Sequence, residues 1–226
     1  MNILCVIPAR SGSKGIIDKN IKDFKGKPLL AWSIEQAKEC KYPMRIIVST
    51  DSLKYAQTAR SYGAEVPFIR PPGISQDHST DLECMDHLLK SVDHPDIILH
   101  LRPTSPLRKV QDINQALDLF IEKFEEYDSL RSIVPVDKSP FKMYRVQDNT
   151  LVPLFTEVNG IKEPYNQARQ VLPDCYLHNG YIDIFKPETI FKGSVTGTKI
   201  LPYLMNKNEI LDIDYPQDLK WENGKS

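Results

Sequence analysis

Three positively charged side chains and two glycines lie close together near the start of the chain, in the segment IPARSGSKGIIDKN (7–20). The charged residues are Arg10, Lys14 and Lys19. Glycines let backbone amides approach an anion closely, and a guanidinium can donate two parallel hydrogen bonds to phosphate oxygens. The composition is typical both of a solvated basic loop and of a cradle for the phosphates of a nucleotide.

Two familiar phosphate-binding patterns are absent from this part of the sequence. The dinucleotide pattern G-x-G-x-x-G needs three glycines, whereas here only Gly12 and Gly15 are present. The Walker A pattern ends in G-K-[ST], but Gly26-Lys27 is followed by Pro28. A dinucleotide-dependent oxidoreductase is therefore disfavoured, and any phosphate cradle must be of another kind.

A pair of carboxylates near the other end of the chain is the second chemical candidate. Asp212 and Asp214 lie two residues apart in LDIDYPQDL, and in a strand this spacing points both side chains to one side. Mg²⁺ usually takes one or two protein carboxylates together with phosphate oxygens and water. Two solvated aspartates at a strand end would have the same sequence, but beside a phosphate-suited loop the pair favours metal-dependent phosphoryl or nucleotidyl transfer.

The elements that must position these residues alternate between strands and helices. Apolar and β-branched runs predict strands over 2–9, 44–50, 65–69, 96–101 and 129–136. Helical spacing and capping residues predict helices over 28–40, 52–63, 79–92 and 110–124. This alternation predicts a parallel α/β sheet, in which ligands bind beyond the carboxyl ends of the strands, where segment 7–20 begins.

The alternation stops near residue 137. Residues 137–178 are polar, irregular and rich in proline, and we interpret them as an insertion of hairpins and loops that serves as a substrate lid or a subunit contact. Strand patterns resume at 180–185, 198–205 and 209–214, followed by a helix after Pro216. We therefore predict a single domain over 1–226 with one insertion.

The overall composition excludes several classes of protein. The net charge is −1, with 41% hydrophobic and 26% charged residues, which is typical of a soluble globular protein without affinity for nucleic acid or anionic membranes. The opening apolar run is too short for a signal peptide or a membrane span, so we expect a cytoplasmic protein. The cysteines contain no C-x-x-C pair and indicate neither a zinc site nor a disulfide framework: Cys5, Cys40, Cys84 and Cys175.

Taken together, the motifs resemble those of the acylneuraminate cytidylyltransferases, also called CMP-sialic acid synthetases. The resemblance runs from residue 3 to about residue 219 and is carried, in order, by IPARSGSKGIIDKN, IIVSTDS, FIRPPGISQDHSTD, LRPTSPLR, ARQVLP, HNG and LDIDYPQDL. It implies a Rossmann-like nucleotidyltransferase fold, with a mostly parallel sheet flanked by helices and a homodimer built through the insertion. It also implies CTP and a nonulosonic acid, which is a 2-keto sugar acid, as substrates and Mg²⁺ as cofactor.

The resemblance implies roles for individual residues. The triphosphate loop would comprise Arg10, Ser13, Lys14, Lys19 and Asn20, and the cytidine pocket Arg70, Ser79 and Asp81. The sugar acid would meet Arg102, Arg169 and Asn179, the metal would bind Asp212 and Asp214, and the catalytic residues would be Arg10, Lys14, Lys19 and Asp212. Ser79 and Asp81 would equally suit the N-cap of the next helix.

The chain departs from the family pattern mainly on the sugar side. Arg102 stands where the family commonly has glutamine, and it could meet the carboxylate of the sugar or a phosphate. Leu177 stands where arginine is frequent, and Asp183 lies in NGYID where NGAIY is common. Ile17 replaces a common proline. His178 is a candidate base, although a single histidine beside a turn more often has a structural hydrogen bond.

Several alternatives remain open at this point. Sialic, legionaminic and pseudaminic acids share the carboxylate and the anomeric centre, and each would suit the motifs. The related enzymes for the eight-carbon acid KDO have a first loop that is richer in arginine and lacks the KGI..KN pattern. A non-catalytic nucleotide-sugar-binding protein could have the same fold, because fold does not fix function.

Overall fold

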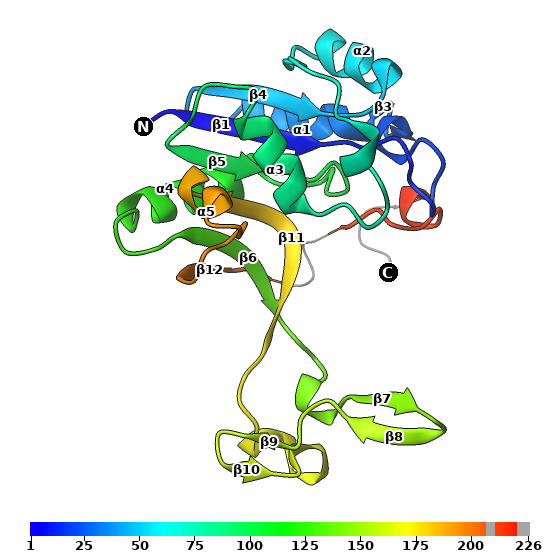
Figure 1. The fold of residues 1–226 in the computed structure, drawn as a ribbon, viewed down its shortest axis with the longest axis vertical. Helices are drawn as coiled ribbons and strands as arrows, with labels where there is room; N and C mark the ends of the chain where they lie inside the picture. Colours follow the sequence, from blue (N-terminus) through cyan, green and yellow to red (C-terminus); the bar gives the residue numbers. More distant parts are fainter. Residues whose placement is uncertain (207–210, 221–226) are drawn as a thin grey trace.

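The computed structural model describes residues 1–206 and 211–220, and its centre is a six-stranded sheet (Figure 1). The strand order is β12-β6-β11-β5-β1-β4, and β11 is the one strand that runs antiparallel to its neighbours. The mostly parallel sheet predicted from the sequence is confirmed. The strands are β1 (Ile3–Pro8), β4 (Met44–Ser49), β5 (Ile97–His100), β6 (Ser129–Pro135), β11 (Tyr176–Phe185) and β12 (Ile200–Leu204).

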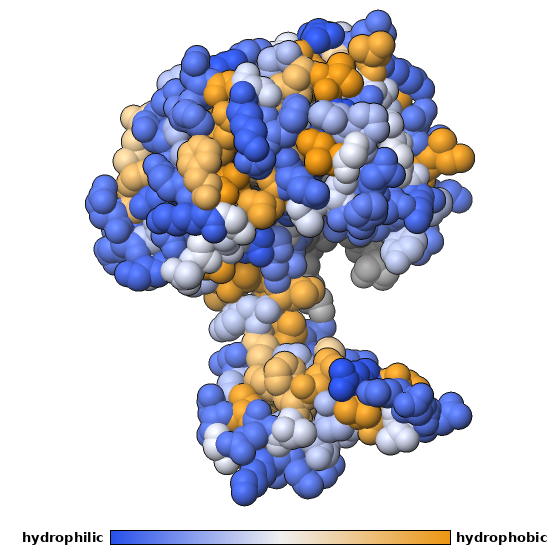
Figure 2. All heavy atoms as spheres, viewed as in Figure 1, coloured by the Kyte–Doolittle hydropathy of each residue, from blue (hydrophilic) through white to orange (hydrophobic). Residues whose placement is uncertain are grey.

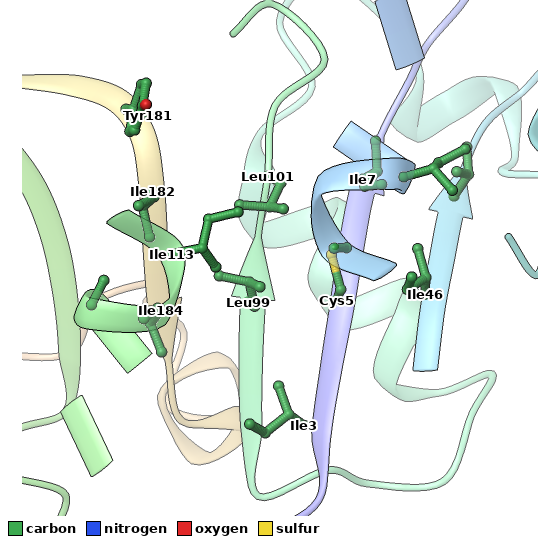
Figure 3. Packing of buried hydrophobic residues seen from close by; sticks show 14 of the residues in the cluster. Ile3, Cys5, Ile7, Ile46, Leu99, Leu101, Ile113, Tyr181, Ile182 and Ile184 are labelled. Carbon is green, nitrogen blue, oxygen red and sulfur yellow. The ribbon is translucent and has the colours of Figure 1, made fainter. Parts of the chain in front are cut away.

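Helices cover both faces of the sheet. One face packs against α1 (Leu29–Lys38), α2 (Leu53–Ser61) and α4 (Val110–Glu122), and the other against α3 (Asp81–Leu89) and α5 (Pro187–Phe191). Because β1 is enclosed on both sides, its residues alternate between the two apolar clusters. In Figure 3, Ile113 of α4 lies against Leu99 of β5 and Leu101, which directly follows β5, on one of these faces.

Two of the predicted strands are absent from the described residues. The segment 65–69 makes a single bridge, between Ile47 and Glu65. Pro67 lacks the N–H that a longer ladder would need. Residues 211–214 form no strand either, because Ile213 donates its N–H to the Thr104 carbonyl (2.8 Å) and the Asp218 carboxylate accepts the N–H of Asp214 (2.9 Å). Residues 209 and 210 of that predicted strand lie outside the described residues.

The end of the described chain is a short 3-10 turn, η7 (Asp218–Lys220). The remainder of the helix predicted after Pro216 lies outside the described residues. Strand β11 is longer than the predicted 180–185, since it begins at Tyr176, and it has an irregularity between His178 and Asp183. Gly180, with φ of +66°, takes up the left-handed backbone conformation at this bend.

The segment between β6 and β11 forms a small lobe away from the sheet (Figure 1). The extended ends of β6 and β11 join this lobe to the sheet. The lobe contains two hairpins, β7 (Tyr144–Gln147) with β8 (Thr150–Pro153) and β9 (Glu157–Val158) with β10 (Ile161–Lys162). Asp148 and Asn149 join β7 to β8 with φ of 49° and 58°, as a primed two-residue turn requires. Figure 2 shows apolar side chains on this lobe and on the stalk that carries it.

Two further features bear on the expectations from the sequence. All four cysteines are free thiols, with Cys5 and Cys84 buried. None of the helices among the described residues combines the length and the hydropathy that crossing a membrane requires.

Candidate active site

A cavity of about 580 Å³ opens where β1, β4 and β5 end, at the carboxyl edge of the sheet. Its walls come from the loop after β1, the segment before α3, the turn after β5 and the chain around Asp214. Parallel strands bring their following loops to one edge, which is why segments so far apart in sequence meet here. The cavity lining includes these residues singled out in the sequence: Arg10, Ser13, Lys14, Lys19, Asn20, Arg70, Ser79, Asp81, Arg102 and Asp214.

The loop after β1 is held in place by side chains on both sides. Buried Asn20 donates to the Arg10 carbonyl (2.9 Å), and the Asp51 carboxylate accepts from both the N–H and the hydroxyl of Ser11 (2.8 Å each). Gly15 allows a close approach, because a Cβ there would lie 2.8 Å from the Asp214 carbonyl oxygen. The segment is therefore an anchored part of the cavity wall rather than a loose basic loop.

The three cations of this loop all carry carboxylate partners. Arg10 Nη1 lies 2.7 Å from Asp77 Oδ1, and Lys14 Nζ lies 2.5 Å from Asp77 Oδ2. Lys19 Nζ lies 2.9 Å from Asp214 Oδ1. The hydrogen bonds from Lys14 and Arg10 hold the pKa of Asp77 below its usual value. Asp77 was not singled out in the sequence, although it lies within the QDHSTD motif.

Arg70 is a buried cation in the same wall. It is 5% exposed, and its Nη1 lies 3.1 Å from the Cys84 sulfur. Within the described residues its Nε has no hydrogen-bond partner. A buried guanidinium with unfilled donors favours a ligand that presents an oxygen acceptor.

The start of α3 shows whether Ser79 and Asp81 cap this helix or are left to meet a ligand. Thr80 is the N-cap and forms a capping box with Glu83, so neither Ser79 nor Asp81 caps the helix. The Ser79 hydroxyl accepts from the Gln76 N–H (2.9 Å), and Asp81 Oδ2 accepts from Arg102 Nη2 (2.9 Å). Burial alone would raise the pKa of Asp81, but its neighbours His100 and Arg102 lower it overall, Arg102 through both its charge and its hydrogen bond.

Asp212 and Asp214 lie at the mouth of the cavity in irregular chain, not at the end of a strand. Asp214 lines the cavity, whereas Asp212 is hydrogen-bonded to the Thr104 side chain beside it. Asp212 as a residue is exposed, but the partial burial of its carboxyl group, with the negative charge of Asp214 as a smaller cause, raises its pKa. The two carboxylates supply oxygen donors that suit a hard cation such as Mg²⁺. Among the described residues no group of three or more potential metal ligands occurs, so phosphate and water oxygens would supply the rest.

On the sugar side, Arg102 is already paired. Its Nη1 lies 2.6 Å from Asp183 Oδ2 and 3.3 Å from the Gly180 carbonyl, in addition to the contact with Asp81. Two carboxylates therefore already neutralise the charge of Arg102. The sequence suggested instead that this arginine could meet the carboxylate of the sugar or a phosphate.

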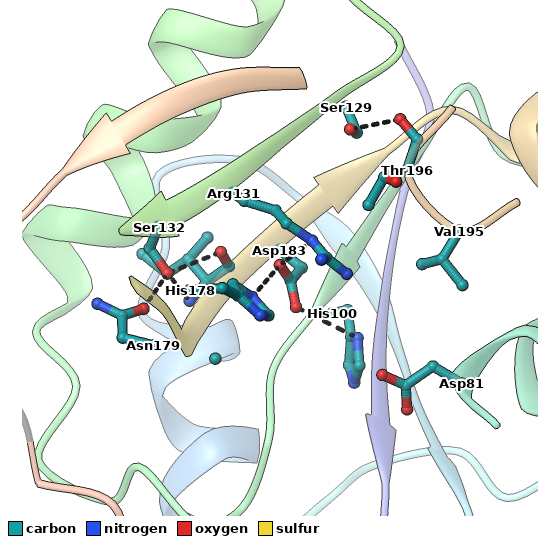
Figure 4. Close-up of polar contacts among 12 residues, drawn as sticks. Asp81, His100, Ser129, Arg131, Ser132, His178, Asn179, Asp183, Val195 and Thr196 are labelled. Carbon is teal, nitrogen blue, oxygen red and sulfur yellow. Dashed lines mark hydrogen bonds and ion pairs between the residues drawn. The ribbon is translucent and has the colours of Figure 1, made fainter. Parts of the chain in front are cut away.

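Asp183 is the centre of a buried charge cluster (Figure 4). It is 2% exposed, and its Oδ1 lies 2.8 Å from His178 Nε2 and 3.3 Å from Arg131 Nε. Burial alone would raise the pKa of Asp183, but the His178 hydrogen bond and the charges around it, including Arg102, lower it well below the usual range. His178 thus has the structural hydrogen bond that its position beside a turn favoured. The sequence indicated Asp183 only as a departure from the family pattern, and Arg131 not at all.

His100 lies behind this cluster and was also missed. It is fully buried, its ring nitrogens have no hydrogen-bond partner among the described residues, and burial lowers its pKa to about 4. The neutral ring therefore borders the cluster without adding a charge at neutral pH. Its position in an apolar strand run gave no signal in the sequence.

The structure does not bring Arg169 and Asn179 to the cavity. Arg169 borders a separate hollow of about 230 Å³ at the base of the lobe. Asn179 Oδ1 accepts from the Ser132 hydroxyl (2.6 Å) and from the Tyr181 N–H (3.1 Å), and these contacts hold the bend in β11. Within one chain, the predicted sugar contacts are therefore divided between the sheet edge and the lobe.

Comparisons with known proteins agree with this architecture. Residues 4–178 match the model of the cytidylyltransferase family. The chain is 35% identical to the CMP-N,N'-diacetyllegionaminic acid synthase of Campylobacter jejuni, over 96% of this chain and 92% of that protein. It is 33% identical to the N-acylneuraminate cytidylyltransferase of Escherichia coli, over 96% of this chain but 50% of that longer protein.

A solved structure of CMP:2-keto-3-deoxy-manno-octonic acid synthetase in complex with CTP has the same fold. It superposes with a TM-score of 0.71 at 17% identity and covers 97% of this chain and 96% of its own. With the family model, the relatives and the fold in agreement, the chain belongs to the cytidylyltransferase family, whose members are nucleotidyltransferase enzymes.

Proposed function

We propose that the protein transfers CMP from CTP to the anomeric hydroxyl of a nonulosonic acid, in a Mg²⁺-dependent reaction that releases pyrophosphate. The main support is one cavity that combines the cations Arg10, Lys14 and Lys19, the buried guanidinium of Arg70 and the carboxylate of Asp214. Asp212 lies beside this cavity, hydrogen-bonded to Thr104. The relatives named for legionaminic and N-acylneuraminic acids support the choice of acceptor.

The triphosphate would bind along the loop after β1. Arg10, Lys14 and Lys19 would donate to the β- and γ-phosphate oxygens and stabilise the charge that passes to pyrophosphate. In this proposal phosphate oxygens replace the present carboxylate partners of these three cations, because both kinds of oxygen accept from the same donor atoms.

The cytosine ring would lie against the segment before α3. Its O2 atom is an acceptor that suits the buried guanidinium of Arg70, and its amino group is a donor that suits the Ser79 hydroxyl or the Asp81 carboxylate. Uracil presents a carbonyl where cytosine has its amino group, and this difference at the acceptors Ser79 and Asp81 is the physical basis that we propose for the choice of CTP.

In the transfer step, the anomeric hydroxyl oxygen attacks the α-phosphorus. The new O–P bond forms as the bond from the α-phosphorus to the bridging oxygen breaks, and pyrophosphate leaves with that electron pair. The hydroxyl proton is released to solvent. Asp212 and Asp214 would hold Mg²⁺, which would polarise the α-phosphate when bound.

We propose that the working form is a cytoplasmic homodimer. The lobe presents exposed apolar residues, including Val146 (74% exposed) and Leu151 (64%), that none of the described residues covers. Arg169 lies on this lobe and would reach a sugar acid only at the cavity of a second copy. The free cysteines agree with a reducing compartment.

The test is an activity panel. The protein is incubated with Mg²⁺, each of the four nucleoside triphosphates in turn, and sialic, legionaminic, pseudaminic or KDO acid, and pyrophosphate is measured. We expect release with CTP and a nine-carbon acid. Release with KDO alone would contradict the proposed acceptor, and CTP binding without release for any acid would contradict catalysis.

A further inference from the structure

A single carboxylate bridges the two most accessible cations of the phosphate loop. Asp77 contacts Arg10 Nη1 through one oxygen (2.7 Å) and Lys14 Nζ through the other (2.5 Å). A phosphate with two free oxygens would use the same two donors. The carboxylate therefore stands where an anionic ligand of this loop would bind.

Asp77 belongs to the segment before α3, which also carries Ser79 and forms another wall of the cavity. Gln76, which precedes it, donates its N–H to Ser79 Oγ (2.9 Å) and its side-chain amide to the Pro72 carbonyl (2.8 Å). Asp77 and Ser79 both line the cavity. Movement of Asp77 away from the cations would thus also affect the segment that carries Ser79.

The two carboxylates that pair with the cations of the loop differ in kind. The partner of Lys19 is Asp214, which has a second role in the proposed metal pair. Asp77 contacts Arg10 and Lys14 and is not part of that pair. Its observed geometry therefore indicates a counter-ion of the phosphate loop.

We propose that Asp77 is an internal competitor for the phosphate groups of the substrate and the product. Nucleotide binding must displace its carboxylate from Arg10 and Lys14, and the carboxylate returns as pyrophosphate leaves. This inference rests on the proposed function, because it assumes that these cations bind the triphosphate. Asp77 would weaken phosphate binding and, by the same competition, hasten the release of pyrophosphate.

The size of the effect follows from the exposure of the groups. The side chains of Arg10, Lys14 and Asp77 are 33%, 82% and 39% exposed, so each ion pair is screened by water. For two such pairs we expect binding of a competing anion to tighten by about threefold to tenfold when Asp77 loses its charge.

The experiment is calorimetric titration of inorganic pyrophosphate into wild type and Asp77→Asn, in the presence of EDTA and at low salt. Asparagine keeps the shape of the side chain and removes the charge. Asp86→Asn is the matched control, since Asp86 of α3 pairs with Lys90 (2.6 Å), the residue that follows this helix, and the substitution changes the net charge equally. We expect tighter binding in Asp77→Asn, unchanged binding in Asp86→Asn, and convergence of all three proteins at high salt.

Two results would overturn the inference. Equal affinities in Asp77→Asn and Asp86→Asn would mean that Asp77 does not compete, and weaker binding in Asp77→Asn would mean that it supports the anion. Circular dichroism of each variant checks the fold. Because the titration uses neither CTP nor a sugar acid, a failure of the proposed transfer reaction would appear in the activity panel and not here.

Discussion

At the scale of single residues, the cavity is defined by charges that partly neutralise one another. Arg10 and Lys14 share one carboxylate, whereas Arg102 and Arg131 share another, which is buried. Exposed ion pairs of the first kind are weak and can exchange partners. Removal of one partner from a buried pair instead lowers the free energy of unfolding by about 3 to 5 kcal/mol. The phosphate side is therefore suited to exchange ligands, and the Asp183 cluster is suited to hold a fixed shape.

The first prediction concerns the carboxylate pair. Asp212→Ala should reduce pyrophosphate release by at least about 100-fold, because it removes a group expected to hold Mg²⁺ beside the α-phosphate. The fold should survive, since Asp212 lies in irregular chain at the surface. Asp118→Ala, at an exposed pair with Lys41, is the control and should keep full activity. Near-normal turnover of Asp212→Ala would remove this residue from the catalytic site.

The second prediction concerns the stability of the Asp183 cluster. Asp183→Asn should lower the free energy of unfolding by about 3 kcal/mol at pH 7, because it leaves the guanidinium of Arg102 without its buried partner. The native pKa of Asp183 is depressed, so its contribution is full above the unfolded value of about 4 and is lost as the pH falls through the native pKa.

Chemical denaturation of both proteins from pH 7 to pH 2 checks this prediction. The difference between wild type and Asp183→Asn should shrink below pH 4. A constant difference over the whole range would show that the ionised carboxylate is not the source of the stabilisation.

At the scale of elements, the loop after β1 depends on a close contact with the chain around Asp214. The contact brings Lys19 to Asp214 and is possible because residue 15 has no side chain. The two ends of the sequence therefore form one wall of the cavity through backbone packing as well as through charge.

This contact gives the third prediction. Gly15→Ala should weaken CTP binding by about tenfold or more, because its Cβ would lie 2.8 Å from the Asp214 carbonyl and backbone must shift. Gly12→Ala is the matched control, since the nearest atom to its Cβ is Arg10 Nη1 at an ordinary 3.8 Å. Titration of CTP into both variants measures the effect, and equal affinities would contradict the role of this contact.

At the scale of the whole molecule, the sheet and the lobe are different kinds of surface. The sheet buries its apolar side chains between two layers of helices, whereas the β7–β8 hairpin of the lobe leaves Val146 and Leu151 exposed. Exposed apolar patches on a small lobe are characteristic of contacts between proteins. In the proposed dimer, the lobe of each chain would lie at the cavity of the other chain. This arrangement would bring together the predicted sugar contacts, which one chain divides between sheet and lobe.

The fourth prediction follows from this surface. Light scattering should give twice the mass of one chain for wild type. Val146→Glu should shift the protein toward the monomer, because Val146 faces Leu151 across the β7–β8 hairpin on one apolar side. Gln147→Glu adds the same charge on the other side of the strand and should remain dimeric. A monomeric wild type would contradict the proposed assembly.

Particular residues show how far sequence reasoning could reach. The apolar run of β1 and the amphipathic pattern of α4 predicted their elements because both have regular burial. The strand predicted over 65–69 was wrong because Pro67 interrupts the ladder. Asp77 and Arg131 were missed because a charged residue in a loop or strand has no local pattern that reveals its partner.

What the sequence determined by itself is the type of fold and the chemistry available at one edge of the sheet. Both follow from local periodicity and from residues that lie close together along the chain, such as Arg10, Lys14 and Lys19. Only the tertiary structure decided which charges are already satisfied, because ion pairs such as Arg10–Asp77 and Arg102–Asp183 join residues 67 and 81 positions apart. Electrostatic pairing depends on distance in space, and the fold alone fixes that distance.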